Sequence, residues 1–399
     1  MKAAVPGLSR RIQAVEFSPT VAMSQRAAEL RRRGERVLDF SVGEPDQPTP
    51  RHVANAAIAA LAAGHTRYTP SAGIPELREA VAHRYREDYG VEYSPRDVVV
   101  TDGGKHALFS VLQCLIDPGD QVIIPAPYWP TFSETVRLAG GRPVIVKTRE
   151  SEGFRVTARL LSKAVRERTR AIIVNTPNNP TGAVVDPQEL LAIGRLARRR
   201  KLTLLYDDTY AKLSLEVLPP PPLKELQALL PTRLVVLGTA SKSYCMTGWR
   251  IGWVLGPRPV ADSVATLVSH STQCPTSFAQ AGAVAALTGS QQYVKRLESE
   301  YRRRLKRIYP QLTAIPGITC TRPSGGFYLF PSVVGHLSRK IPSSLELAMR
   351  LLDDQKLAVV PGEGFAAPGY IRISIARSSD ELSEGIGRLA AFLARQAGA

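Results

Sequence analysis

Seven short apolar segments, separated by stretches with a helical pattern, constrain the fold of this 399-residue chain more than any other feature. Strands inside a parallel sheet have continuous apolar sequences, because helices cover both faces of the sheet. The alternation therefore predicts an α/β fold with a seven-stranded, mostly parallel sheet. We expect its strands at Val98–Thr101, Gln121–Ile124, Pro143–Val146, Ala171–Asn175, Thr203–Tyr206, Leu234–Gly238 and Ile251–Val254.

The length of the chain predicts two domains, since single cores rarely grow beyond about 250 to 300 residues. A charged helix from Gln291 to Tyr309 would carry the chain out of the sheet domain. We assign residues 1–45 to an N-terminal arm and part of a small domain, 46–290 to a large domain, and 291–399 to a small α+β domain. Strands of the small domain are expected near Ile318–Thr321, Phe327–Phe330, Ala358–Val360 and Ile371–Ile375.

Composition narrows the class of protein. No segment approaches the roughly 20 apolar residues of a membrane span, and the first 35 residues lack the pattern of a signal peptide. We therefore expect a cytoplasmic protein without membrane contact. The four cysteines form no CxxC pair, so neither a disulfide framework nor a metal site is predicted.

The net charge of +17 and the pI near 10.0 leave two interpretations open. A basic stripe could bind nucleic acid by neutralising phosphates. The basic clusters at 31–33, 198–201 and 302–307 are instead far apart in sequence and lie in helical patterns, which is typical of solvated helix faces. We expect no nucleic-acid partner, and the positive field also suits small anionic ligands.

The segment Leu234–Trp253 places a lysine directly after a predicted buried strand. Small-molecule sites in parallel sheets form beyond the carboxyl ends of the strands. Lys242 could be desolvated there and become nucleophilic. The alternative is a solvated lysine in a loop, the commonest environment of this residue.

Polar groups follow several other predicted strands. Gly103 and Gly104 precede a helix, where free amides suit a phosphate, although such a turn can also be only a turn. Trp129 offers an aromatic face or packs in the core, and Asn179 lies in a turn with two prolines. Asp207 directly follows a predicted buried strand, where a carboxylate is costly without a cationic partner. Together these groups suit pyridoxal 5'-phosphate, which needs a lysine for its aldehyde, an acid for its ring nitrogen, and arginine and amides for its phosphate.

With these motifs the chain resembles the class I aminotransferases of the fold-type I pyridoxal-phosphate enzymes, and among them the bacterial aspartate/prephenate aminotransferase subgroup. The resemblance covers nearly the whole chain. It rests on Gly43-Glu44-Pro45-Asp46, Ala72 to Arg78, Gly103-Gly104-Lys105, Pro127-Tyr128-Trp129, Asn178 to Gly182, Ser241-Lys242, Met246 to Gly252 and Arg372-Ile373-Ser374.

The resemblance implies a role for each site residue in an aminotransferase that moves an amino group from an L-amino acid to a 2-oxo acid. Lys242 would bond to the cofactor and carry the proton. Asp207 would pair with the ring nitrogen, Tyr210 and Asn179 would bind the ring oxygen, and Trp129 would stack on the ring. Gly104, Lys105, Thr239 and Arg250 would hold the phosphate, together with Tyr68 from the second subunit of a homodimer. Arg372, Asn179 and the Gly43 amide would bind the substrate carboxylate.

Substrate choice depends on Lys105 and Glu16. In the family a lysine at the position of Lys105 reads a distal carboxylate, which argues for aspartate-like substrates. The arm departs from the family pattern, because Glu16 stands where relatives tend to carry lysine. Glu16 could point away, pair with Lys105, or admit a cationic side chain, so the substrate could be a specialised one. A lyase or an oxidase acting on an amino acid in the same site is the alternative to transamination.

Overall fold

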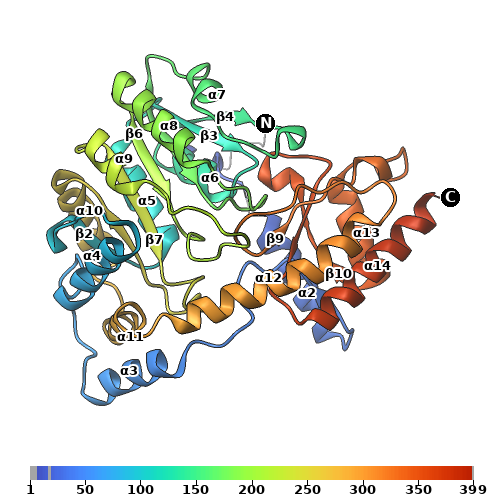
Figure 1. Cartoon of the computed structure of the whole chain (residues 1–399), viewed down its shortest axis with the longest axis horizontal. Coiled ribbons are helices and arrows are strands. Elements are labelled where there is room, and N and C mark those ends of the chain that lie inside the picture. Colours follow the sequence, from blue (N-terminus) through green and yellow to red (C-terminus); the bar gives the residue numbers. More distant parts are fainter. Residues whose placement is uncertain (1–6, 17–18, 398–399) are drawn as a thin grey trace.

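A computed structural model of the chain describes residues 7–16 and 19–397, and a seven-stranded sheet forms its centre (Figure 1). The strand order is β2-β8-β7-β6-β5-β3-β4. Only β8 runs antiparallel to its neighbours, so the predicted mostly parallel sheet is confirmed. The strands are β2 (Val98–Thr101), β3 (Gln121–Ala126), β4 (Arg142–Lys147), β5 (Thr169–Asn175), β6 (Thr203–Asp207), β7 (Leu234–Thr239) and β8 (Gly252–Leu255).

Helices cover both faces of this sheet, which explains its continuous apolar strands. In β2, Val98 and Val100 join one core while Val99 joins the core on the other face. Helices α5 (Gly104–Leu115), α6 (Thr131–Leu138) and α10 (Arg258–Ser271) pack on the face of Val99. The other face carries α4 (Pro75–Tyr89), α8 (Pro187–Arg200), α9 (Leu223–Leu229) and α11 (Ser277–Thr288), with α3 (Arg51–Ala62) packed on α11 and α7 (Ala158–Ser162) on α8.

A smaller α+β unit lies beside the sheet and shares one core (Figure 1). Its three-stranded sheet has the order β11-β12-β9, and β1 pairs in parallel with β10. The elements of this unit are α2 (Pro19–Arg32), β1 (Leu38–Asp39), α12 (Gln292–Thr313), β9 (Tyr328–Leu329), α13 (Ser344–Gln355), β10 (Leu357–Ala358), β11 (Val360–Pro361), β12 (Ile371–Ser374) and α14 (Ser379–Ala397), with short 3-10 helices at 334–336 and 362–365. Helix α1 (Arg10–Gln13) instead contacts α6, and two further 3-10 helices lie at 95–97 and 150–152. The domain boundaries at 45/46 and 290/291 stay a prediction.

One predicted strand of this smaller unit was wrong, and one predicted helix ends later than expected. The segment Ile318–Thr321 forms only an isolated bridge between Thr319 and Ser332, because prolines at 316 and 323 limit its backbone pairing. Helix α12 does not stop at Tyr309 but continues through Pro310 to Thr313. A proline this close to the end removes only one helical hydrogen bond.

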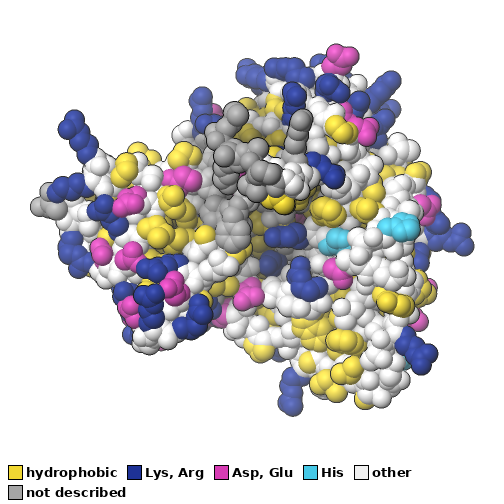
Figure 2. All heavy atoms as spheres, turned by 180° about the vertical axis from the view of Figure 1, so that it is seen from behind, with side chains coloured by type: hydrophobic (Ala, Val, Ile, Leu, Met, Phe, Trp, Pro, Cys, Tyr) yellow, Lys and Arg dark blue, Asp and Glu magenta, His cyan; other side chains and the backbone are white. Residues whose placement is uncertain are grey.

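The basic clusters lie in helices, as their sequence pattern indicates. They occupy the ends of α2 and α8 and the middle of α12. Several arginines pair with acids one turn away, for example Arg33 with Glu29 and Arg303 with Glu300. Figure 2 shows lysine and arginine side chains scattered over one face with acidic ones among them. No helix in the described part of the chain combines the length and the apolar composition that crossing a bilayer requires.

Candidate active site

Lys242 lies in the turn that follows β7, and its amine is buried. Its Nζ donates a hydrogen bond of 2.6 Å to the backbone oxygen of Gly43. Burial lowers the pKa of Lys242 to about 8; the charge of Glu44 opposes this shift, and Arg372 and Arg250 add to it. A substantial fraction of the amine is therefore neutral near pH 8, as a nucleophile or base requires.

Asp207 is the last residue of β6 and is 5% exposed. The amide of Thr209 donates to its Oδ1 at 2.9 Å. Burial raises the pKa of Asp207, with hydrogen bonds from Thr209 opposing the shift. Among the described residues no ion pair includes Asp207. The carboxylate is therefore a buried acid that lacks a cationic partner from the chain itself.

Arg372 on β12 is a buried cation, and residues 7–16 and 19–397 provide no acidic partner for it. Its side chain donates from Nη1 to Asn179 Oδ1 at 3.1 Å and from Nη2 to the oxygen of Ser41 at 2.7 Å. Its Nε is buried and has no partner in the described structure. The guanidinium lies 4.4 Å from the ring centre of Tyr328 and 5.2 Å from that of Phe365. Since an unpaired buried charge is costly, this arrangement indicates a site for an anion.

The glycine turn before α5 meets Arg250. Gly103 has a φ of +86°, and a Cβ there would lie 2.5 Å from Nη2 of Arg250, so only glycine allows this approach. Arg250 donates to the backbone oxygens of Thr247 at 2.6 Å and Asp102 at 3.4 Å. Thr239 Oγ1 lies 2.9 Å from Ser241 Oγ. A helix N-terminus, an arginine and two hydroxyls thus meet at one place, as a phosphate requires.

The predicted ring-binding groups are close to these charges. The Tyr210 hydroxyl lies 3.0 Å from that of Tyr328, and Asn179 joins Arg372 as described above. The ring of Trp129 lies 5.3 Å from Nζ of Lys105. Tyr68 is different, since 84% of it is exposed. Its predicted role, binding the cofactor phosphate of a second subunit, stays a prediction.

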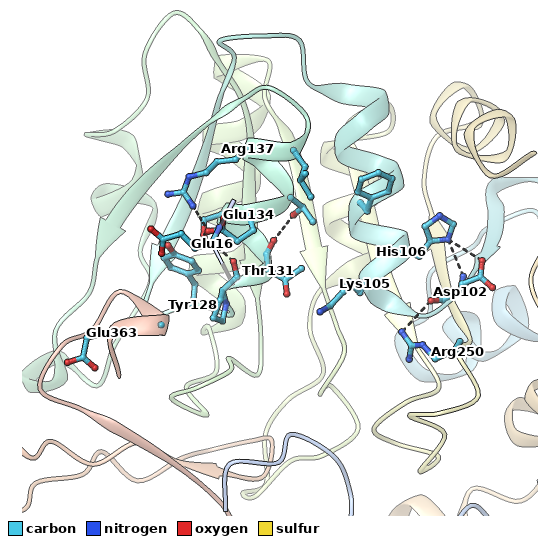
Figure 3. Close-up of a pocket in the computed structure, with 16 residues that line it drawn as sticks. Glu16, Asp102, Lys105, His106, Tyr128, Thr131, Glu134, Arg137, Arg250 and Glu363 are labelled. Atoms are coloured by element: carbon cyan, nitrogen blue, oxygen red, sulfur yellow. Dashed lines mark hydrogen bonds and ion pairs between the residues drawn. The ribbon is translucent and has the colours of Figure 1, made fainter. Parts of the chain in front are cut away.

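A cavity of about 520 Å³ opens beside the glycine turn (Figure 3). Lys105, Arg250 and Glu16 are the predicted site residues that line it. Lys105 projects into the space, and burial, with the charge of Arg250, lowers its pKa. Glu16 lies across from it beside Glu134, whose Oε2 accepts a 3.0 Å hydrogen bond from the Glu16 amide. The two side chains of Glu16 and Lys105 form no ion pair, and the neighbouring arm residues 17 and 18 lie outside the described part.

The sequence did not identify Tyr328, Phe365 or Glu44 as site residues. The rings of Tyr328 and Phe365 both lie close to the guanidinium of Arg372, and the charge of Glu44 raises the pKa of Lys242 against the effect of burial. Aromatic residues in apolar segments are usually core, so the sequence carries no signal that separates these two from core residues. Glu44 belongs to the Gly43-Glu44-Pro45-Asp46 motif and could have been suspected on that ground.

This sheet, with a buried lysine and an unpaired acid at the ends of neighbouring strands, is the fold of the fold-type I aminotransferases, as the solved structures show. Residues 35–389 match the family model "Aminotransferase class I and II", and the chain belongs to this family. The chain is thus an aminotransferase of the pyridoxal-phosphate-dependent class, which moves an amino group from an amino acid to a 2-oxo acid.

Relatives match along nearly their whole length. The chain is 42% identical to an aspartate/prephenate aminotransferase of Thermus thermophilus, over 98% of this chain and 99% of the relative. It is 40% identical to an aspartate aminotransferase of Geobacillus stearothermophilus, over 98% and 100%. The solved structure of the Thermus thermophilus aspartate aminotransferase with maleate superposes with a TM-score of 0.92 at 41% identity, over 97% of this chain and 100% of that one. The resemblance found in the sequence is confirmed, and transamination is favoured over the lyase and oxidase alternatives.

Proposed function

We propose that the enzyme takes the amino group from an acidic L-amino acid, with pyridoxal 5'-phosphate held at the carboxyl ends of β6 and β7. The observation that carries the proposal is the pair of buried, unpaired charges near Lys242. Within the described residues, Asp207 has no cationic partner and Arg372 has no anionic one, and the two ligands they suit are a protonated pyridine nitrogen and a substrate carboxylate.

The residues of the site fit the cofactor. Asp207 would hold its ring nitrogen in the protonated form, and Trp129, Tyr210 and Asn179 would hold the ring. The phosphate would take the amides that begin α5 at Gly104 and Lys105, with Arg250 and Thr239. When bound, the cofactor supplies an aldehyde for the amines of lysine and substrate and a ring that withdraws electrons from the substrate Cα.

Lys242 moves the proton in this proposal. Its amine has a pKa of about 8 and is held by the Gly43 oxygen, so it is available as a base near neutral pH. Arg372 binds the α-carboxylate through its free Nε and a neighbouring Nη, and the Asn179 amide supports the guanidinium from the other side. The substrate Cα–H is then held close to Lys242.

Lys105 supports an acidic donor, as in the relatives named aspartate aminotransferase. Lys105 is a cation that lines the cavity, and no ion pair joins it to an acid among the described residues, so a distal carboxylate of aspartate or glutamate would pair with it. Glu16 on the opposite wall favours a second candidate, a substrate with a cationic or hydrogen-bond-donating side chain.

We also propose a homodimer in which Tyr68 reaches the phosphate of the second subunit. Its 84% exposure leaves the hydroxyl free for a partner, and Ile58 and Leu61 on nearby α3 are exposed apolar residues that a second copy would cover.

Two experiments test these proposals. Borohydride treatment of the cofactor-loaded protein, followed by peptide mapping, is expected to fix the cofactor on Lys242, with Lys242→Ala as the unlabelled control. Label on another residue, or none, would refute the cofactor site. Rates with aspartate, glutamate, arginine and lysine as donors then decide the substrate class, and a preference for the basic donors would replace the acidic candidate by the second one.

A further inference from the structure

Arg304, in the middle of α12, is 3% exposed, and all three nitrogens of its guanidinium donate hydrogen bonds. Its Nη1 and Nη2 donate to the two carboxylate oxygens of Asp46 at 2.9 and 2.8 Å. Its Nε donates to Glu300 at 2.8 Å, and Nη1 also reaches the backbone oxygen of Ile375 at 3.2 Å. The arginine therefore joins its own helix to two segments that are distant in sequence.

The first of these segments leads to Lys242. Asp46 lies three residues after Gly43, whose oxygen accepts the hydrogen bond from Lys242 at 2.6 Å. Between them, Glu44 accepts a 2.8 Å hydrogen bond from Thr247 in the lysine turn. The ion pair between Asp46 and Arg304 thus holds the segment 43–46, which contacts the amine of Lys242 through Gly43.

The second segment leads to Arg372. Ile375 directly follows β12, the strand of Arg372. The amide of Ser374 donates to Phe40 at 2.9 Å, and Arg372 donates to Ser41 at 2.7 Å, so β12 and the segment before Gly43 are joined side by side. Arg304 contacts both segments, through Asp46 in the first and through the backbone oxygen of Ile375 in the second.

Charge and geometry both stabilise the ion pair between Arg304 and Asp46. Burial acts to raise the pKa of Asp46, but the hydrogen bonds and charge of Arg304 outweigh it, and the net shift is downward. The planar fork binds both carboxylate oxygens at once and still reaches a carbonyl, which the single ammonium of lysine cannot do. Glu300 binds the same guanidinium but contacts neither segment in any hydrogen bond described here.

We propose that Arg304 is a positioning residue, which holds the Gly43 oxygen beside Lys242 and the strand of Arg372 at one fixed spacing. This rests on the roles proposed above for Lys242 and Arg372. A donor amino acid must span that spacing, with its carboxylate on Arg372 and its Cα beside Lys242. A displacement of about 1 Å in such an arrangement can cost about 100-fold in rate.

The test compares Arg304→Lys and Asp46→Asn with Glu300→Gln as the matched control. The first two variants are expected to lower kcat/KM for the donor by about 10- to 100-fold, chiefly through KM, and to weaken binding of maleate, an unreactive dicarboxylate, by a similar factor. Glu300→Gln should stay within about twofold of the wild type, because it loosens the arginine without releasing Asp46.

Hydrogen exchange of residues 40–46 in the cofactor-free protein provides a readout that does not depend on activity. It should quicken in Arg304→Lys and Asp46→Asn and not in Glu300→Gln. Unchanged KM, maleate affinity and exchange in a folded Arg304→Lys protein would overturn the proposal, as would an equal effect of Glu300→Gln. Failure of the wild type to label at Lys242 would refute the proposed function instead, and the exchange experiment would still decide the role of Arg304.

Discussion

Two buried arginines of this protein, Arg304 and Arg372, differ in whether an acid of the chain neutralises their charge. Arg304 is 3% exposed and is bound by the carboxylates of Asp46 and Glu300. Arg372 is 2% exposed, donates to two neutral oxygens and lies near two aromatic rings, and its buried Nε has no partner in the part of the chain that the structure describes. The protein neutralises the first cation itself, and we propose that a ligand neutralises the second. Burial alone therefore does not mark a functional charge, whereas burial without a counter-charge does.

Two partly or fully buried lysines repeat this difference. Lys212 forms an ion pair with Asp88, and burial lowers its pKa, with Asp88 opposing the shift. For Lys242 the described residues provide a backbone oxygen as the sole hydrogen-bond acceptor, and its pKa is lowered to about 8. Lys212 is thus neutralised by an acid of the chain, whereas we propose that Lys242 reacts.

The largest expected effect tests the two lysines. Lys242→Ala should lower the transamination rate by about 10⁴-fold or more, because it removes both the cofactor bond and the base. Lys212→Ala should leave the rate within about threefold, since its partner Asp88 keeps an ion pair with Arg84. Steady-state rates of both variants, compared at equal amounts of folded protein, check this. A loss of similar size in Lys212→Ala would break the comparison.

The second prediction separates the two arginines. Arg372→Met should lower kcat/KM for the donor by about 10²- to 10³-fold while leaving the cofactor-free protein as stable as the wild type or more so, because an unpaired buried charge is removed. Arg304→Met should lower the free energy of unfolding by about 3 to 5 kcal/mol, since Asp46 is left unpaired. Urea unfolding and donor kinetics measure both. Equal stability losses in the two variants would contradict the distinction.

The third prediction concerns two acids, Asp207 and Asp46. Burial raises the pKa of Asp207, so its contribution to stability is present at low pH and is lost as pH rises through that raised pKa. Asp207→Asn should therefore stabilise the cofactor-free protein at neutral pH by about 1 kcal/mol and reduce the gain in thermal midpoint on adding cofactor.

For Asp46→Asn we expect the opposite change in stability. The pKa of Asp46 is lowered, so its stabilising contribution is present above the unfolded pKa and is lost as pH falls through the folded pKa. Its replacement should destabilise the protein at neutral pH. Thermal midpoints from pH 4 to 8 compare the two, and parallel pH profiles would show that the acids do not differ.

The smallest expected effect is a shift in a pH profile. With a pKa of about 8 instead of its ordinary value of 10.5, about a quarter of the Lys242 side chains are neutral at pH 7.5 in the cofactor-free protein. Labelling of Lys242 by an amine-reactive reagent should therefore level off above pH 8, while exposed lysines continue to gain reactivity. Mass spectrometry of the labelled peptides measures this. A profile that still rises at pH 10 would show that the amine is solvated.

Sequence reasoning found the groups that follow strands and missed those that come together from distant segments. Asp207 and Lys242 were identified from their place after apolar runs, and both lie at the predicted edge of the sheet. Arg372 was identified only through the family resemblance, because an arginine on a strand is usually exposed. The pairing of Arg304 with Asp46, which lie 258 positions apart in sequence, was not predicted, although Asp46 belongs to the motif that begins at Gly43.

The sequence by itself determined the seven-stranded sheet, the covering helices and the family, because these depend on local periodicity and on motifs of a few adjacent residues. Only the tertiary structure decided which buried charges are neutralised within the protein. Pairing depends on distances between segments such as α12, the Gly43 segment and β12, which no local pattern encodes. The same residue type is therefore a structural clamp at position 304 and a proposed ligand site at position 372.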